Sequence, residues 1–413
     1  MVTNHTQGGD HIKILIIADD FTGALDTGVK FTAAGVFTKV TTDLETDFSV
    51  HSGLEALVLC APTRHLPPHE ACAIIRPIAQ RAAAAGIDCI FKKTDSALRG
   101  NIGAELQAVL DGSNGSVLDF IPALPAMNRI TAAGIHYIDG VPVAESVFGQ
   151  DPFSPVTESN ISALIASQSD GTTEILSNPE TEPQMTPCIC VHDCTSQEEM
   201  GRILEVLQHK GRLHLVAGCA GLAESLPRYL GLAKESPALP RTRSNRLMVV
   251  CGSLNPISCR QLDHGEQLGY SRVHLPAELL LAENDIWCAS KTELEDTLWQ
   301  VCCRAPRVII DSLAQGADAS GTQQPTERYR ERVAARIGYL LKRLLDRGAE
   351  GRILVIGGDT LLAFLDAIGC HEIVPVCELQ QGVVLSRITY GQKEWEIVTK
   401  SGGFGKADLL EHL

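Results

Sequence analysis

Short apolar runs alternate with amphipathic stretches along the first half of the chain. Each run has the length of a strand, and the stretches between them have the apolar spacing of helices. We expect strands at residues 14–17, 36–41, 56–60, 89–93, 116–121, 188–191 and 213–217, and helices at residues 68–85 and 102–110. Regular alternation of strands and helices is typical of a parallel sheet with helices on both faces.

A second alternation begins at Leu247 and ends in a strand and helix within RILVIGGDTLLAFLDAIG. Residues 230–246 combine Pro, Ser and a basic cluster and are the preferred linker. A chain of 413 residues is also too long for one typical core. We therefore predict an α/β protein of two domains, residues 1–240 and 241–413. Each domain should have a mainly parallel sheet flanked by helices, with the active site in the cleft between the domains.

Two adjacent carboxylates, Asp19 and Asp20, directly follow the first apolar run. Ligands of open α/β sheets bind at the carboxyl ends of strands, beside the N-termini of helices. Asp is also a preferred N-cap, so either residue alone has a structural explanation. Because adjacent side chains point in different directions, we do not expect both to cap, and one remains for chemistry.

A polar cluster follows the run at residues 89–93, in the sequence FKKTDSALRG. Lys93 and Arg99 suit a carboxylate, whereas Asp95 and Ser96 suit hydroxyl groups, so the cluster fits a polyhydroxylated acid. A charged helix start taken alone is more often a solvated cap, but the second acidic strand end weakens that alternative. Arg64 follows another apolar run and should lie at the same edge.

Three glycine-rich turns in the second half are of the phosphate-binding type, because glycine lets a phosphate approach the backbone and a helix N-terminus attracts its charge. They occur in CGSLNPIS, GGDT and KSGGFG. The expected nucleotide-binding residues are Ser253, Gly357, Gly358, Asp359, Thr360, Gly402 and Gly403. The chain contains neither G-x-x-x-x-G-K-[ST] nor G-x-G-x-x-G, which excludes a P-loop and argues against a standard dinucleotide fold.

Three other segments are polar or carry possible metal ligands, and we interpret each of them here. Residues 122–155 are too polar and too broken by Gly and Pro for a core, and we expect a long loop that serves as a lid or partner surface. His136 in this loop is either a general base or, more simply, a hydrogen-bonded histidine. Residues 167–187 read as a surface excursion. In CICVHDC, which begins at Cys188, the spacing of two favours core packing over zinc binding. We predict no metal site formed by the chain itself.

The composition is ordinary for a soluble globular protein, with 44% hydrophobic and 21% charged residues. No apolar run approaches the length that spans a bilayer, and the polar N-terminal segment lacks a signal-peptide core. We expect a cytoplasmic protein without a membrane partner. The formal net charge of −15 argues against nucleic acid. The oligomeric state stays open, and a homodimer is compatible with the sequence.

Six separated motifs together resemble one family, the four-carbon acid sugar kinases, formerly a domain family of unknown function. The motifs are, in order, ADDFTGALDTG, KTDSALRGNIGAE, AMNRITAAGIHYIDGVPVAESVFGQDPFSPV, CGSLNPIS, GGDT and KSGGFG, and the resemblance covers essentially the whole chain. It implies that the N-terminal domain binds the acid and the C-terminal domain binds ATP. Residues 130–149 are most similar to the D-threonate kinases, although residues 127–131 depart from the usual Gly-Arg-Thr form.

The resemblance implies phosphoryl transfer from ATP to the C4 hydroxyl of D-threonate, with D-erythronate and 3-oxo-tetronate as alternative acceptors. Asp19 or Asp20 would be the catalytic base. The expected substrate-binding residues are Asp20, Arg64, Lys93, Thr94, Asp95, Ser96 and Arg99. Mg²⁺ would bridge the phosphates. The rivals are a sugar-acid-binding regulator without chemistry and a hydroxy-acid oxidoreductase, neither of which explains three glycine-rich turns together with two acidic strand ends.

Overall fold

The computed structural model describes residues 11–50, 53–151, 154–235, 244–312, 327–401 and 403–413. The chain forms two compact units, Met1–Pro237 and Ala238–Leu413. The middle of the predicted linker, residues 236–243, lies outside the described residues. Two α/β units with mainly parallel sheets confirm the predicted fold class, and each unit is described by itself below.

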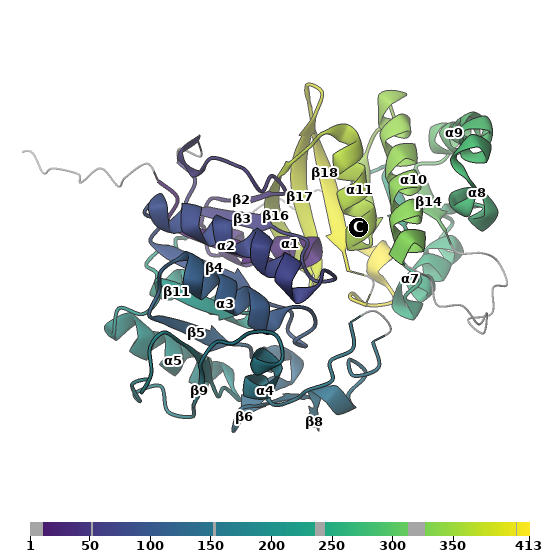
Figure 1. Ribbon diagram of the computed structural model, residues 1–413. Helices are drawn as coiled ribbons and strands as arrows, with labels where there is room; N and C mark the ends of the chain where they lie inside the picture. The colour runs from purple at the N-terminus through teal and green to yellow at the C-terminus, as the bar shows by residue number, and fades with distance from the viewer. Residues whose placement is uncertain (1–10, 51–52, 152–153, 236–243, 313–326, 402) are drawn as a thin grey trace, which may run out of the picture. The chain divides into compact units, whose positions relative to one another are not determined.

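The first unit is built on a fully parallel sheet (Figure 1), in the order β2-β3-β1-β4-β11-β5-β10-β9. Its strands are β1 (Ile14–Ala18), β2 (Thr38–Thr41), β3 (Ala56–Cys60), β4 (Cys89–Lys93), β5 (Val117–Ile121), β9 (Thr173–Leu176), β10 (Cys188–His192) and β11 (Leu215–Gly218). Every residue of β1, β3 and β4 is buried, as expected for strands that helices cover on both faces. Strand β9 lies within the predicted surface excursion, which therefore supplies an edge strand of the sheet.

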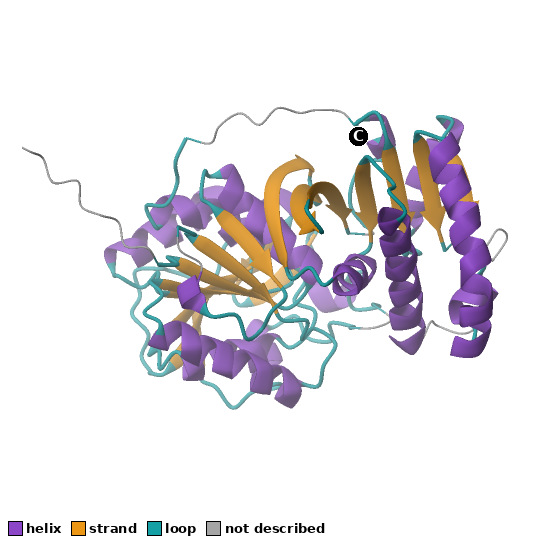
Figure 2. Ribbon diagram, turned by 90° about the horizontal axis from the view of Figure 1, so that it is seen from above, coloured by secondary structure: helices purple, strands orange, loops and turns teal. Residues whose placement is uncertain are grey.

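Helices cover both faces of this sheet (Figure 2). They are α1 (Phe21–Ala33), α2 (Pro68–Ala84), α3 (Ile102–Gly112), α4 (Ile161–Ala166), α5 (Gln197–His209) and α6 (Ala220–Tyr229), with the 3-10 turn η1 at Phe48–Val50. Helices α2, α3 and α4 share one apolar core with alternate residues of the strands. Helix α6 packs against both α1 and α5. The intervening strand residues, such as Ile16 and Phe91, are also fully buried.

Residues 122–155 were predicted to be a long loop, and this prediction is wrong for much of the segment. It forms a small antiparallel sheet of β6 (Arg129–Ala132), β7 (Ile135–Ile138) and β8 (Val141–Pro142), flanked by the turns η2 (Pro125–Met127) and η3 (Val143–Glu145). The strands are at most four residues long and are joined by tight turns with left-handed residues such as Asp139. Such short strands give no clear periodic pattern in the sequence.

The second unit has its own sheet, in the order β13-β14-β12-β15-β18-β17-β16. The strands are β12 (Leu247–Cys251), β13 (Ser271–His274), β14 (Arg307–Asp311), β15 (Arg352–Ile356), β16 (Glu372–Gln380), β17 (Val383–Tyr390) and β18 (Lys393–Lys400). Pairing is parallel from β13 to β18 and antiparallel among β18, β17 and β16. The sheet is thus mainly parallel, with an antiparallel edge that the sequence did not predict.

The helices of the second unit also pack on both faces of its sheet. They are α7 (Pro256–Gln267), α8 (Ala277–Leu281), α9 (Asn284–Arg304), α10 (Glu327–Asp346) and α11 (Gly358–Ile368), with the final turn η4 at Leu409–Glu411. Helix α7 and η4 bury apolar residues against one face, which includes Val249 and Leu354. Helix α10 packs against α8, α9 and α11, and α11 contacts β15 and β18.

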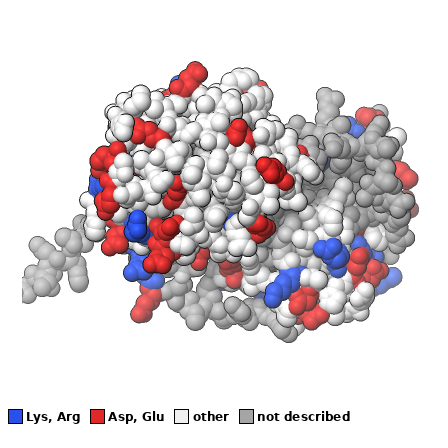
Figure 3. Space-filling model, turned by 90° about the horizontal axis from the view of Figure 1, so that it is seen from below, with Lys and Arg blue, Asp and Glu red and all other residues white. Residues whose placement is uncertain are grey.

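Acidic side chains are scattered over the face shown in Figure 3, where Lys and Arg form only small, separate groups. The described part of that face carries no extended basic patch, in line with the net charge of −15. No helix among the described residues is both long and apolar enough to cross a membrane.

Candidate functional site

The topology of the first sheet brings the predicted acid-binding residues to one edge. Residue Ala18, which ends β1, is in register with Cys60 of β3 and Lys93 of β4, so three neighbouring strands end at the same level. The chain leaves β1 toward β2 and β3 on one side and returns to β4 on the other. This reversal of strand order is a topological switch point, where open α/β sheets bind ligands. The segments after the three strands carry Asp19, Arg64 and Asp95.

Arg64 is the centre of the charge network at this edge. Its Nε donates to Asp19 Oδ2 at 2.7 Å, and its Nη2 donates to Asp20 Oδ1 at 2.6 Å. The same Nη2 lies 3.7 Å from Asp95 Oδ1. One guanidinium therefore links the two aspartates after β1 with the aspartate after β4, and it fixes their spacing.

Asp20 occupies the N-cap position of α1, but its side chain makes no capping hydrogen bond. Its carboxylate instead accepts hydrogen bonds from Arg64 and, at 3.0 Å, from the hydroxyl of Thr22. The capping explanation for Asp20 is therefore wrong. Its side chain is 23% exposed, compared with 4% for Asp19, so of the two carboxylates Asp20 is the more accessible.

The remaining acid-site residues cluster around Asp95. Arg99 binds both oxygens of Asp95, at 2.9 and 3.0 Å. The Lys93 ammonium donates to the carbonyl of Thr94 at 2.8 Å. A Cβ at Gly23 would lie 3.0 Å from Lys93 Nζ and 2.4 Å from Asp20 Oδ1, so this glycine lets both groups approach the first turn of α1.

The charges in this cluster keep the buried carboxylates ionised. Burial would raise the pKa of Asp19, but the charges of Arg64 and Lys92 outweigh it and lower the pKa. Burial likewise opposes ionisation of Asp95, but Arg99 and Arg64 hold the pKa of Asp95 well below its usual range. Carboxylates that stay ionised can accept hydrogen bonds from hydroxyl groups.

A second layer of polar contacts lies under this edge. The fully buried ammonium of Lys92 is 2.6 Å from Glu105 Oε2, and it donates to the carbonyls of Ile17 and Lys93. Glu105 also accepts a hydrogen bond from Thr63 at 2.6 Å. These contacts tie β1, β4, α3 and the segment before Arg64 to one another.

The small sheet β6-β7-β8 and the segment after η3 supply residues that the sequence interpretation did not assign to the site. Arg129 donates through Nη1 to the Ser96 hydroxyl, and its guanidinium lies over the ring of Phe148. Both residues lie in the third motif of the family resemblance, and apart from that the sequence marks them only by the polar character of residues 122–155.

His136 is buried and contacts the site through the backbone. Its Nε2 lies 3.0 Å from the Ser96 carbonyl, and its Nδ1 lies 3.1 Å from Thr131 Oγ1. Burial lowers the pKa of His136 to about 4, and the nearby positive charge of Arg129 acts in the same direction. Of the two interpretations of His136, these contacts support the hydrogen-bonded structural histidine.

In the second unit, the glycine-rich turns also converge at one sheet edge. Cys251 is in register with Ile356, and Ile356 with Lys400, so β12, β15 and β18 end together. The chain leaves β12 toward β13 and β14 and returns to β15 on the other side, which makes a second switch point. The turns after β12 and β15 nearly touch, because a Cβ at Gly252 would lie 2.2 Å from Thr360 Oγ1.

The structure places the other predicted nucleotide-binding residues around this edge. Gly357 is the N-cap of α11, with a positive φ of 114°, and Gly358 begins the helix. Asp359 is ion-paired with Arg330 at 2.6 Å. Ser253 accepts a hydrogen bond from the backbone of Asn255. Gly403 lies beside Asn255, because a Cβ at Gly403 would be 3.7 Å from its Nδ2, whereas Gly402 lies outside the described residues.

These residues fit the phosphates of a nucleotide. The Gly357 N-cap has no side chain, so it leaves the first N–H groups of α11 without a side-chain cap, and a helix N-terminus of this kind attracts phosphate. The nearby ammonium of Lys400 is 3.2 Å from Ser258 Oγ, and burial lowers the pKa of Lys400 to about 8. Near neutral pH Lys400 therefore keeps the positive charge that phosphates need.

The part of the chain that the structure describes contains no group of three or more His, Cys, Asp or Glu side chains placed to hold a metal ion. In the segment CICVHDC, the sulfur atoms of Cys188 and Cys190 lie 3.6 Å apart in the core, and His192 pairs with Asp119 at 2.7 Å. This arrangement supports the core-packing interpretation of the segment.

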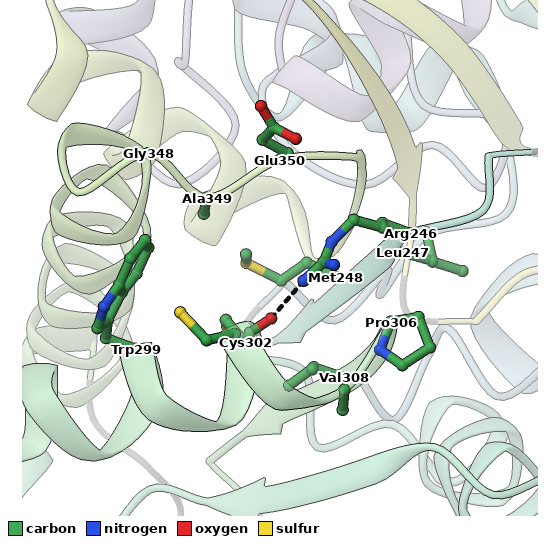
Figure 4. A pocket seen from close by; sticks show the side chains of 12 residues that line it. Arg246, Leu247, Met248, Trp299, Cys302, Pro306, Val308, Gly348, Ala349 and Glu350 are labelled. Atoms are coloured by element: carbon green, nitrogen blue, oxygen red, sulfur yellow. Dashed lines mark hydrogen bonds between the residues drawn. The ribbon is translucent and has the colours of Figure 1, made fainter.

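A surface pocket of about 260 Å³ lies elsewhere in the second unit (Figure 4). Its lining includes Leu247, Val308 and residues 348–350, which lie at the N-terminal ends of β12, β14 and β15. Arg246 Nη2 donates to the Cys302 carbonyl at 2.5 Å beside it. The pocket is therefore at the opposite edge of the sheet from the glycine-rich turns, and we do not assign the nucleotide to it.

The sequence matches two family models, one in each half of the chain. Residues 14–226 match a sugar-binding N-terminal domain, and residues 248–410 match a nucleotide-binding C-terminal domain. The chain is 31% identical to a D-threonate kinase of Bordetella bronchiseptica over 98% of this chain and 96% of that protein. It is 27% identical to a D-threonate kinase of Salmonella typhimurium over 97% of both chains. It is 24% identical to a D-erythronate kinase of Heliobacterium modesticaldum over 96% of this chain and 95% of that protein.

Solved structures show the same fold. A Salmonella typhimurium protein superposes with a TM-score of 0.81 at 23% identity, over 97% of this chain and 98% of that one. A Haemophilus influenzae protein from a domain family of unknown function superposes with a TM-score of 0.74 at 21% identity, over 96% and 98%. The fold and the two sheet edges define a two-domain α/β protein, and the family models and relatives identify its class as a phosphotransferase. The chain belongs to the four-carbon acid sugar kinase family.

Proposed function

We propose that this protein transfers the terminal phosphoryl group of ATP to the C4 hydroxyl of D-threonate. The observation that carries the proposal is the partly exposed carboxylate of Asp20, held by Arg64 at the strand edge that also presents Lys93 and Asp95. The D-threonate kinases among the relatives favour D-threonate as acceptor. D-Erythronate and 3-oxo-tetronate are the alternatives, because kinases of both are also similar to this chain.

Asp20 is our candidate for the base, and Asp19 for a positioning residue. A base must touch the hydroxyl that it deprotonates, and Asp20 is the more exposed of the two carboxylates. Asp19 acts on the site through Arg64, which it orients with a 2.7 Å hydrogen bond. Asp95 and the hydroxyls of Thr94 and Ser96 would bind the hydroxyl groups of the acid.

The glycine-rich edge of the second unit would hold ATP. Gly252 and Gly357 let the phosphates approach the backbone, and the N-terminus of α11 and Lys400 supply positive potential. Mg²⁺, when bound, would neutralise charge on the phosphates. We assign it to the phosphates of ATP and not to a set of protein ligands. Direct transfer requires the acid and the nucleotide to meet, and the interdomain cleft stays a prediction.

The test is ADP release from ATP and Mg²⁺ with a panel of D- and L-threonate, D- and L-erythronate and 3-oxo-tetronate. We expect the highest kcat/KM with D-threonate. A higher value with another acid would keep the kinase and change the acceptor. Binding of an acid without acceptor-dependent ADP release would favour the regulator that binds without chemistry.

Two asparagine variants separate the roles of the aspartates. Asp20→Asn should lower kcat by about 100-fold or more, because the base is lost, and should leave ATP binding intact. Asp19→Asn should raise the KM for the acid more than it lowers kcat, because the orientation of Arg64 is loosened. Near-normal turnover in Asp20→Asn would refute its assignment as the base.

A further inference from the structure

Arg129 differs from the other arginines around the acid site in the partners it has. Lys93 also has no ion pair among the described residues, but its ammonium lies beside Gly23 and donates to the Thr94 carbonyl. Its Nη1 donates to the Ser96 hydroxyl, and its guanidinium carbon lies 5.1 Å from the centre of the Phe148 ring. Arg99 stacks on the same ring at 5.3 Å. Stacking on an aromatic face holds the plane of a guanidinium in one orientation.

The neighbouring arginines are already paired with carboxylates. Arg64 is bonded to Asp19 and Asp20, and Arg99 holds both oxygens of Asp95. Among the residues that the structure describes, Arg129 has no carboxylate within the 4.0 Å of an ion pair. It therefore brings a positive charge to the site that no side chain of the described residues neutralises, in a chain of net charge −15.

The site also has two chemically different ends. Asp20 and Lys93 both border Gly23, at the start of α1. Arg129 contacts Ser96, the residue after Asp95, and Asp95 Oδ1 lies 3.7 Å from the Arg64 nitrogen that also binds Asp20. The candidate base follows β1, whereas the guanidinium without a carboxylate partner comes from β6 and contacts the segment after β4. An acid with a terminal hydroxyl and a terminal carboxylate needs one group of each kind.

We propose that Arg129 binds the C1 carboxylate of the acid, with Ser96 beside it, so that the C4 hydroxyl points toward Asp20 and Lys93. The proposal rests on the proposed function and adds to it the direction in which the acid lies. A planar guanidinium binds a carboxylate through two parallel hydrogen bonds, which a lysine ammonium cannot form. Arg129 thus selects acids over polyols of the same length.

The experiment compares wild type, Arg129→Gln and Arg129→Lys with two acceptors, D-threonate and threitol, which has a hydroxymethyl group in place of the carboxylate. We expect Arg129→Gln to raise the KM for D-threonate by roughly 10- to 100-fold, with little change in the KM for ATP. Its kcat/KM for threitol should stay at the low wild-type value. The KM of Arg129→Lys for D-threonate should lie between the values of wild type and Arg129→Gln. Lysine keeps the positive charge but cannot form two parallel hydrogen bonds to a carboxylate.

The matched control is Arg81→Gln. Arg81 also stacks on a phenylalanine of the first unit, at 5.4 Å from the Phe48 ring, but it lies in the last turn of α2, away from the strand ends that carry the site. This variant should keep the wild-type KM for D-threonate. An equal loss with D-threonate and threitol in Arg129→Gln would mean that Arg129 is structural and would overturn the proposal.

Calorimetric titration of D-threonate into wild type and Arg129→Gln separates this proposal from the proposed function. Weaker binding by the variant, in line with its KM, supports the assignment of the carboxylate. If wild type turns over D-threonate and Arg129→Gln binds it equally well, only the role of Arg129 fails. If wild type neither binds nor phosphorylates any of the acids, the proposed function fails and the role of Arg129 falls with it.

Discussion

His136 shows how one buried residue makes stability depend on pH. Both of its ring nitrogens have partners, Ser96 and Thr131, and burial together with the charge of Arg129 lowers its pKa from the ordinary 6.5 to about 4. The folded chain therefore holds this imidazole neutral at pH values where the unfolded chain protonates it. Below pH 6.5 the unfolded state binds more protons, so the free energy of unfolding decreases as the pH falls toward 4.

This difference in pKa lowers the free energy of unfolding by up to about 3 kcal/mol between pH 6.5 and pH 4. We expect His136→Gln, which does not titrate, to flatten the pH dependence of stability in this window. Urea unfolding at several pH values from 7 to 4.5 measures it. The control is His69→Gln, which removes a histidine whose side chain is 81% exposed. An unchanged slope in His136→Gln would show that His136 does not cause the pH dependence.

At the scale of elements, the buried pair of Lys92 and Glu105 connects the strands that carry the acid site. Lys92 on β4 reaches the Ile17 carbonyl on β1 and Glu105 on α3, and Glu105 also binds Thr63. Removal of one partner leaves a charge buried without compensation, which is more costly than removal of both.

Lys92→Met should therefore lower the free energy of unfolding by about 3–5 kcal/mol, and the double variant Lys92→Met/Glu105→Gln should recover part of the loss. Urea unfolding measures both variants. The matched control is Lys234→Met. Lys234 pairs with Glu55 at 2.7 Å, close to the 2.6 Å between Lys92 and Glu105, but its side chain is 56% exposed, so loss of this ion pair should lower the free energy of unfolding by under about 1 kcal/mol. Equal costs for Lys92→Met and Lys234→Met would contradict the role of the buried pair.

The elements also show what could be predicted from the sequence. Strands β3 and β4 begin and end where predicted, because buried parallel strands are short apolar runs with polar residues after them. The strand-edge rule then placed Asp20, Arg64 and Asp95 together without any knowledge of side-chain contacts.

The remaining features depend on contacts between distant segments. Arg129 reaches Ser96 only because residues 129–142 fold into a small sheet, and its strands are too short to show a periodic pattern. Helix α9 was likewise not predicted, because apolar and charged residues mix along its length without a clear stripe. The antiparallel pairing of β16 to β18 is set by tight turns at residues such as Gly391, which has a φ of +63°.

At the scale of the whole molecule, each unit has its own buried core and its own switch point. In both units a glycine allows a close approach next to the predicted ligand. Gly23 faces Asp20 Oδ1, and Gly252 faces Thr360 Oγ1. If the acid and the nucleotide bind to separate units, disturbance of one glycine should affect only one ligand.

The variants Gly23→Ala and Gly252→Ala test whether the acid and the nucleotide bind to separate units. The new methyl group would lie 2.4 Å from Asp20 Oδ1 in the first variant and 2.2 Å from Thr360 Oγ1 in the second, so in each case the neighbouring group must move. We expect Gly23→Ala to weaken D-threonate binding by about tenfold or more and to leave ATP binding unchanged, and Gly252→Ala to do the reverse. Calorimetric titration of each ligand alone measures the four affinities. If either variant weakens the binding of both ligands equally, a local displacement in one unit affects both binding sites. The acid and the nucleotide would then not bind to separate units.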